Sequence, residues 1–151
     1  MNIRQCIGRL RPLERLALGA SASEIGSPVW RRVQSIDELD AALAGASGKP
    51  VLLDFYADWC VSCKEMDRFT FSDPRIAAKL AGVQLLRADV TANNGEDKAL
   101  LKRFGLFGPP GTIFFDGQGV DVPGARVIGF EPANQFLTSL ARGVASMRPA
   151  L

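Results

Sequence analysis

A nearly continuous apolar run, Val51–Ala57, is followed within six residues by two cysteines, Cys60 and Cys63. Such a run is typical of a central strand that is covered on both faces. The residues that follow predict a helix that begins near Cys60 and ends near Phe69. The chain must therefore place a C-x-x-C pair where a buried strand turns into a helix, and this requirement constrains both its fold and its chemistry.

Cap, turn and periodicity signals divide the rest of the chain into alternating helices and strands. They predict a helix after Ser35 that ends by Pro50, a short helix from Pro74, a strand over 83–90, a helix over 96–104, a strand over 112–115, a turn over 116–119, a returning strand over 126–129 and a final helix from Pro132. A β-α-β unit followed by a hairpin and a closing helix predicts an α/β fold. We expect a four-stranded mixed sheet with helices on both faces.

Charge separates an N-terminal leader from the rest of the chain. Residues 1–34 hold six arginines and two glutamates, whereas the remainder holds 12 basic and 14 acidic residues. We expect residues 1–30 to be a flexible leader or linker rich in Ala, Gly and Ser, residues 31–146 to form the folded domain, and residues 147–151 to be a tail. Gly19 and Ser21 interrupt the short apolar stretch of the leader, which argues against a cleavable secretory signal. Two interpretations stay open: a cytosolic protein with a loose N-terminus, and a piece of a larger protein.

Composition excludes several classes of function. The chain has no histidine, which removes Ser-His-Asp and Cys-His catalysis, His-ligated zinc and c-type haem attachment. The net charge of +2 gives no indication of nucleic-acid binding. No apolar run approaches the ~18 residues of a membrane-spanning helix.

The C-x-x-C pair predicts redox chemistry. At a helix start, free backbone N–H groups favour a thiolate at Cys60, and Cys63 lies one turn deeper, where it can resolve a mixed disulfide. Half of a zinc site is a weaker interpretation, because only Cys6 remains as a further sulfur or imidazole ligand. A permanent structural disulfide is the other alternative, although so small a loop would stabilise little. Cys6 is interpreted as an incidental thiol.

Four blocks in order resemble the thioredoxin superfamily and, more narrowly, the C-terminal periplasmic domain of the DsbD family of thiol:disulfide interchange proteins. They are Tyr56–Glu65, Thr70–Pro74, Val90–Asn93 and Phe114–Gly119, and the resemblance extends from about Trp30 to Arg142. It implies a thioredoxin fold. It also implies a protein-disulfide reductase with no cofactor beyond the Cys60–Cys63 disulfide and no metal.

The resemblance further implies an electron relay in the periplasm, as a monomeric domain of an inner-membrane protein that serves cytochrome c biogenesis. Its partners would be protein disulfides and dithiols, namely the transmembrane and N-terminal domains of the same DsbD-like protein. Neither of those domains is present in this chain. Two alternatives stay open: a stand-alone cytoplasmic thioredoxin-like reductase, and a thioredoxin-fold binding or chaperone module without turnover.

Two carboxylates are candidates for tuning the cysteines. Asp54 interrupts the apolar strand, where a carboxylate is costly unless it is neutral or used. The resemblance places it beneath the cysteines, where it would transfer the proton of Cys63; the alternative is that it faces a polar edge. Asp67 shares a helix face with both cysteines, unless it is a solvated surface acid. Turned inward, it would raise the pKa of Cys60. We therefore expect a poorly reactive reductant that docking activates.

Three further residues are candidates for substrate docking. The resemblance implies a cis bond at Pro110 that exposes the backbone of Pro109 to an extended partner segment; an ordinary turn is the alternative. Pro109 has no N–H to donate, and Gly111 stands where thioredoxins usually carry Thr. Trp59, beside the nucleophile, is expected to shield the site and to form part of the docking surface, rather than to fill the core.

Overall fold

The computed structural model describes residues 27–145, and a five-stranded sheet forms its centre. The strands are β1 Arg31–Val33, β2 Val51–Tyr56, β3 Gln84–Asp89, β4 Gly111–Phe115 and β5 Val127–Ile128. Their order across the sheet is β1-β3-β2-β4-β5. The first three strands are parallel, and β4 and β5 run antiparallel to their neighbours. The predicted fold class is confirmed, with one strand more than the four expected.

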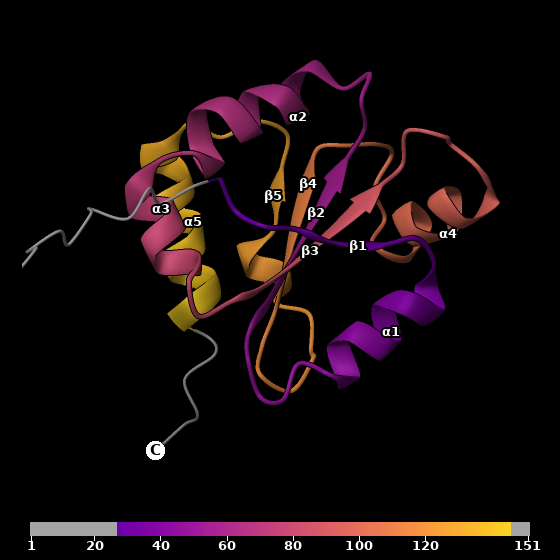
Figure 1. The fold of residues 1–151 in the computed structure, drawn as a ribbon, viewed down its shortest axis with the longest axis horizontal. Helices are drawn as coiled ribbons and strands as arrows, with labels where there is room; N and C mark the ends of the chain where they lie inside the picture. The colour runs from indigo at the N-terminus through magenta and orange to yellow at the C-terminus, as the bar shows by residue number, and fades with distance from the viewer. Residues whose placement is uncertain (1–26, 146–151) are drawn as a thin grey trace, which may run out of the picture.

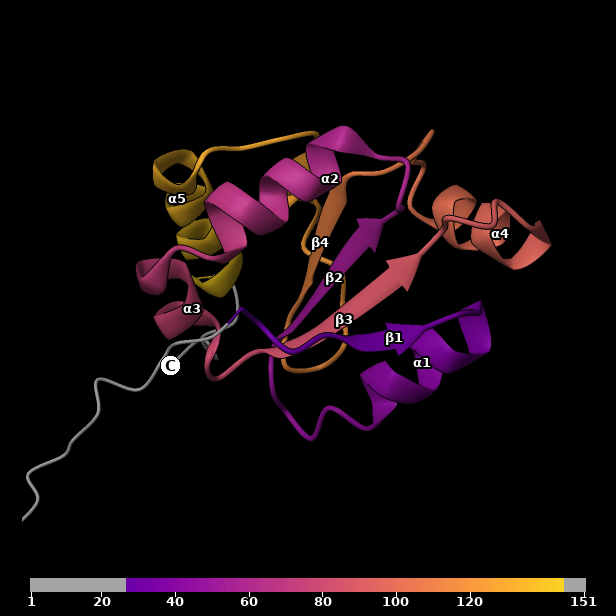
Figure 2. The ribbon, with the colours of Figure 1, turned by 45° about the horizontal axis from the view of Figure 1, so that its top comes forward.

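The additional strand, β1, lies at the edge of the sheet beside β3 (Figure 2). It has only three residues, and two of them are exposed arginines. Neither alternation nor an apolar run could indicate a strand of this length and composition. The predicted leader and tail boundaries concern residues that lie largely outside the described part of the chain, as Cys6 does.

Helices cover both faces of the sheet (Figure 1). They are α1 Ile36–Ala44, α2 Val61–Glu65, the π-helix η1 Met66–Phe71, α3 Pro74–Leu80, α4 Gly95–Arg103, the 3₁₀ helix η2 Pro123–Ala125 and α5 Ala133–Ala145. One apolar cluster joins α1 and α4 to one face, and a second joins η1, α3 and α5 to the other. Residues 51–55 of β2 are buried throughout, as a strand covered on both faces requires.

Local signals in the sequence determine where most helices begin. Ser35, Asp73 and Asn94 cap α1, α3 and α4 by accepting backbone N–H groups with their side chains. The helix predicted from Cys60 to Phe69 instead continues to Phe71, with its second half wound as η1. The wider turn of a π-helix brings residues about five apart onto one face. Met66 and Phe71 therefore both point into the core.

The predicted hairpin contains an additional element. Asp116 accepts the backbone N–H groups of Gln118 and Val120, which forms the expected turn. The short helix η2 then precedes β5, so the strands pair over two residues only, with Gly111 opposite Ile128. Within residues 27–145, no helix is long and apolar enough to cross a membrane.

Truncation of Phe136 tests the packing that supports η1. Phe136 is fully buried on α5 and packs edge-to-face on Phe71 with ring centroids 5.4 Å apart. We expect Phe136→Ala to lower the free energy of unfolding by about 3–5 kcal/mol, measured by urea denaturation. Phe69→Ala, at an exposed ring of η1, is the matched control, with a loss of about 0.5 kcal/mol. Equal losses in both variants would contradict this view of the core.

Candidate active site

Cys60 and Cys63 form a disulfide at the N-terminal end of α2. Their Cα atoms are 5.3 Å apart, and the backbone N–H of Cys63 donates to Cys60 Sγ at 3.2 Å. Cys60 is 7% exposed and Cys63 is 3% exposed. An N–H group directed at Cys60 favours its thiolate in the reduced protein. The arrangement therefore suits Cys60 to attack and the deeper Cys63 to resolve.

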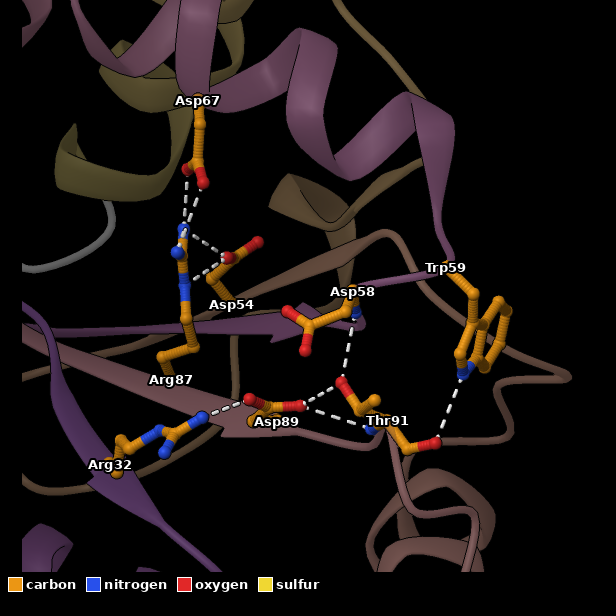
Figure 3. Close-up of polar contacts among 8 residues, drawn as sticks. All are labelled: Arg32, Asp54, Asp58, Trp59, Asp67, Arg87, Asp89 and Thr91. Carbon is orange, nitrogen blue, oxygen red and sulfur yellow. Dashed lines mark hydrogen bonds and ion pairs between the residues drawn. The ribbon is translucent and has the colours of Figure 1, made fainter.

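Thr91 anchors the loop between β2 and α2 (Figure 3). Its hydroxyl oxygen accepts the backbone N–H of Asp58 at 2.9 Å, and its carbonyl accepts the indole N–H of Trp59 at 3.1 Å. Asp89 in turn accepts the backbone N–H of Thr91 at 3.0 Å and forms an ion pair with Arg32. The residues just before the cysteines are thereby tied to the end of β3.

Trp59 remains exposed in spite of this anchor. Its indole N–H is bonded to Thr91, yet 58% of the residue is accessible to solvent. The alternative of a core aromatic therefore does not hold. The hydrogen bond to Thr91 thus holds an exposed apolar ring in one orientation beside Cys60.

Asp54 lies in β2 beside Arg87 of β3, and the two residues are in register. Arg87 Nε donates to Asp54 Oδ2 at 2.9 Å, and Arg87 Nη2 lies 2.8 Å from the same oxygen. Asp54 is buried in a central strand between β3 and β4, so the alternative of a polar edge is wrong. The backbone immediately after Asp54 reaches the cysteines, because Cys63 Sγ lies 3.8 Å from the carbonyl oxygen of Phe55.

Asp67 lies on η1 and is bonded to the same arginine (Figure 3). Arg87 Nη2 donates to Asp67 Oδ1 at 2.6 Å, and Arg87 Nη1 donates to Asp67 Oδ2 at 3.1 Å. The sequence predicts that an inward-facing Asp67 would crowd the cysteines with a second negative charge. The structure instead places a cation between Asp67 and Asp54, and about a third of the Asp67 side chain is exposed.

Sequence reasoning missed Arg87. Its guanidinium lies between two aromatic rings, 4.5 Å from the centroid of Trp30 and 4.7 Å from that of Tyr56. Its side chain is 13% exposed. The available signal was a basic residue inside the strand predicted over 83–90, next to a strand with a buried acid. A buried carboxylate needs a partner, and an arginine on a neighbouring strand is a suitable one.

The surroundings of Asp54 change its acidity. Burial raises the pKa of Asp54, Arg87 lowers it and the charge of Asp67 raises it, with a resulting value of about 7 against 3.8 in the unfolded chain. A carboxyl group with a pKa near neutrality can act as either an acid or a base under ordinary conditions.

The segment before β4 completes the end of the sheet at which the cysteines lie. The peptide bond between Pro109 and Pro110 is cis, the isomer expected from the sequence. Gly111 pairs with Phe55 of β2, so this segment lies where β2 ends. A Cβ atom at Gly111 would lie 2.8 Å from the side chain of Leu106, so a larger residue at this position would require that side chain to move. Phe107, in the same segment, is fully exposed.

The described residues contain no group of three or more His, Cys, Asp or Glu side chains arranged to hold a metal ion. The site is built from a cysteine pair, a buried carboxyl group with its arginine, and exposed aromatic residues.

Replacement of Asp54 tests its raised pKa. Because the folded state retains a proton on Asp54 up to about pH 7 and the unfolded state loses it near 3.8, the cost of this residue grows as pH rises through that window. We expect Asp54→Asn to stabilise the oxidised protein by on the order of 2–4 kcal/mol at pH 8 and by much less at pH 4. Urea unfolding at the two pH values measures this difference.

The control for this prediction is Asp40→Asn, which removes an exposed carboxylate that pairs with Arg103 on the surface. Its effect is expected to stay within about 0.5 kcal/mol at both pH values. A change in stability for Asp54→Asn that is the same at pH 4 and pH 8, or a loss of stability at pH 8, would contradict a titrating Asp54.

Comparison with known proteins places this site in a family. Residues 38–143 match the family model of the thioredoxin-like domain. The chain is 56% identical over 148 residues to the thiol:disulfide interchange protein DsbD of Ralstonia nicotianae, covering 92% of this chain and 24% of that protein. It is 50% identical over 131 residues to DsbD of Cronobacter sakazakii, covering 86% of this chain and 23% of that protein.

A solved structure agrees with these matches. The oxidised C-terminal domain of Neisseria meningitidis DsbD is 39% identical, with a TM-score of 0.60, and the match covers 71% of this chain and 90% of that domain. The chain spans about a quarter of the length of the curated relatives it matches. The chain therefore belongs to the thioredoxin-like family and, within it, to the C-terminal domains of DsbD proteins.

Proposed function

We propose that this chain is a thiol–disulfide oxidoreductase that exchanges electrons with protein disulfides through Cys60 and Cys63. The observation that carries the proposal is the cysteine pair at the start of α2, with the Cys63 sulfur against the strand that holds Asp54. The two sulfurs form a disulfide with the backbone as it stands, so the oxidised form needs no rearrangement of the fold. Membership of the DsbD C-terminal domains supports the same activity.

In the reducing direction, the Cys60 thiolate attacks one sulfur of a partner's disulfide. A mixed disulfide forms, and the partner's second sulfur leaves as a thiolate that takes a proton from water. Cys63 then gives its proton to the Asp54 carboxylate and attacks Cys60 Sγ. The Cys60–Cys63 bond forms and the mixed disulfide breaks. The partner's remaining sulfur leaves as a thiolate that takes a proton from water, so the partner is released as a dithiol. Two electrons pass from this domain to the partner.

We further propose that the domain is an intermediate carrier that passes electrons from one domain of a larger protein to another. A dithiol in a membrane-embedded domain would reduce Cys60–Cys63, and the disulfide of an N-terminal periplasmic domain would be the next acceptor. The support is the short share of each DsbD relative that the chain covers, which leaves most of those proteins to other domains. On this proposal the domain works in the periplasm as a monomer.

The end of the sheet that carries the cysteines is the proposed docking surface. Trp59 and Phe107 contribute exposed aromatic rings there, and Val61 is also exposed. Pro109 and Pro110 lie on the same side, beyond the end of β2. Because Pro109 lacks an N–H, it can only accept a hydrogen bond from the backbone of a partner segment.

Cysteine variants test the exchange reaction. Cys60→Ser is expected to lower the rate of insulin reduction by more than about 100-fold, because the attacking sulfur is lost. Cys63→Ser is expected to accumulate a mixed disulfide with the substrate, visible by non-reducing electrophoresis, because no resolving thiol remains. Equal insulin reduction by wild type and Cys60→Ser would refute the proposed function.

Surface variants test the docking surface. Trp59→Ala and Phe107→Ala are each expected to raise KM for the oxidised N-terminal domain of a DsbD protein by about 10-fold, since exposed aromatics dominate such contacts. The rate of Cys60 alkylation by iodoacetamide should stay within about twofold of wild type for Phe107→Ala. The control is Val120→Ala, in the turn at the opposite end of β4, with an unchanged KM. Equal KM values for all three variants would exclude this surface.

A further inference from the structure

Arg87 holds the two carboxylates of the site in one cluster. Three of its nitrogens engage Asp54 and Asp67, with donor–acceptor distances between 2.6 and 3.1 Å. The residues come from three separate elements, β2, η1 and β3. A lysine could not reproduce this arrangement, because one ammonium group lacks the planar fork that engages a carboxylate with two parallel bonds.

Aromatic rings fix the guanidinium in place. Trp30 and Tyr56 lie on it at 4.5 and 4.7 Å, and Trp30 itself packs edge-to-face on Phe71 of η1. Two rings on one guanidinium restrict its movement and add cation–π attraction. The positive charge is therefore held at one point between the acids.

Two charged groups act on the protonation of Asp54, namely Arg87 and Asp67. Burial makes the neutral acid more stable, Arg87 favours the carboxylate, and Asp67 opposes it. On the same face, Tyr56 is a neutral phenol whose pKa is raised by burial and by Asp58. Arg32 is engaged by Asp89 at the edge of the sheet. Without Arg87, burial and Asp67 would both keep the proton on Asp54.

We propose that Arg87 is a positioning residue for the exchange reaction: it clamps Asp54 and Asp67 into one acid–base unit, so that Asp54 can release and regain the Cys63 proton at neutral pH. This inference rests on the proposed function. Arg87 touches neither sulfur nor substrate and acts through Asp54.

Solvent reaches the outer side of the clamp. A cavity of about 170 Å³ is lined by Asp67, Arg87, Trp30 and Phe71, together with residues 27–28. The Asp67 side of the cluster thus faces the surface, whereas Asp54 is enclosed.

The test is a titration of the Asp54 side-chain carboxyl by carbon-detected NMR in the oxidised protein, where no thiol titrates. The wild-type midpoint is expected near pH 7. We expect Arg87→Gln to raise the midpoint by about one unit or more, and Asp67→Asn to lower it, because they remove charges of opposite sign. Arg103→Gln, which removes a cation from a remote surface ion pair with Asp40, is the control with an unchanged midpoint.

Kinetics supply a second readout. For reduced Arg87→Gln, single-turnover resolution of a mixed disulfide at Cys60 should be about fivefold slower at pH 7, because a one-unit rise lowers the carboxylate fraction from about one half to about one tenth. Its pH profile should move to higher pH by the same amount. A purely structural role for Arg87 would lower stability without moving the profile.

An Asp54 midpoint in Arg87→Gln equal to or below that of wild type would overturn the proposal. If Arg87→Gln does not fold, Arg87→Lys decides: a midpoint and pH profile equal to wild type would show that the fork is unnecessary. Failure of wild type to reduce insulin would instead remove the proposed function, and the NMR titration would still report whether Arg87 controls Asp54.

Discussion

The ion pair between Asp54 and Arg87 is the interaction on which the rest of the site depends. A carboxyl group in the middle of a covered sheet loses its water, and the folded state tolerates it only with a proton or a cation. Arg87 supplies the cation from the adjacent strand, and it is in turn satisfied by Asp67 and flanked by aromatic rings. Without Arg87, the Asp54 carboxylate would have no cation beside it in the interior, and the carboxyl group would keep its proton instead.

Strand β3 organises both polar networks of the site. Arg87 and Asp89 are two residues apart, and side chains at this spacing leave a strand on the same face. Arg87 engages the acids, whereas Asp89 engages Thr91 and, through it, the loop that carries Trp59. A single register between β2 and β3 therefore sets the position of the carboxyl group and of the residues before the cysteines at once.

Much of this architecture could be predicted from local sequence. The cap residues, the apolar run of β2 and the turn at Asp116 report on backbone preferences that act over a few residues. The cysteine pair is recognised in the same way, because its spacing and its place before a helix are local. Burial of Asp54 could be predicted from its neighbours, because both faces of a strand with apolar residues on each side are covered by other parts of the fold.

The features that escaped prediction depend on pairing between distant segments. Arg87 is 33 residues from Asp54, and only the register of β2 with β3 brings them together. The contact of Asp67 with Arg87 joins η1 to β3 across 20 residues of sequence, so helical spacing alone could not give it. Strand β1 is defined by its bonds to β3 and not by its own composition, which is that of a charged loop.

The two outer strands have a consequence for how the molecule meets others. β1 has three residues with two outward arginines, and β5 has only two residues. Edge strands with unpaired backbone groups can pair with other chains, and short edge strands, or edge strands that carry charged side chains, discourage such pairing. Each edge of the sheet therefore offers another chain few backbone groups to pair with, and at β1 the two exposed arginines add to this protection against sheet extension between copies of the domain.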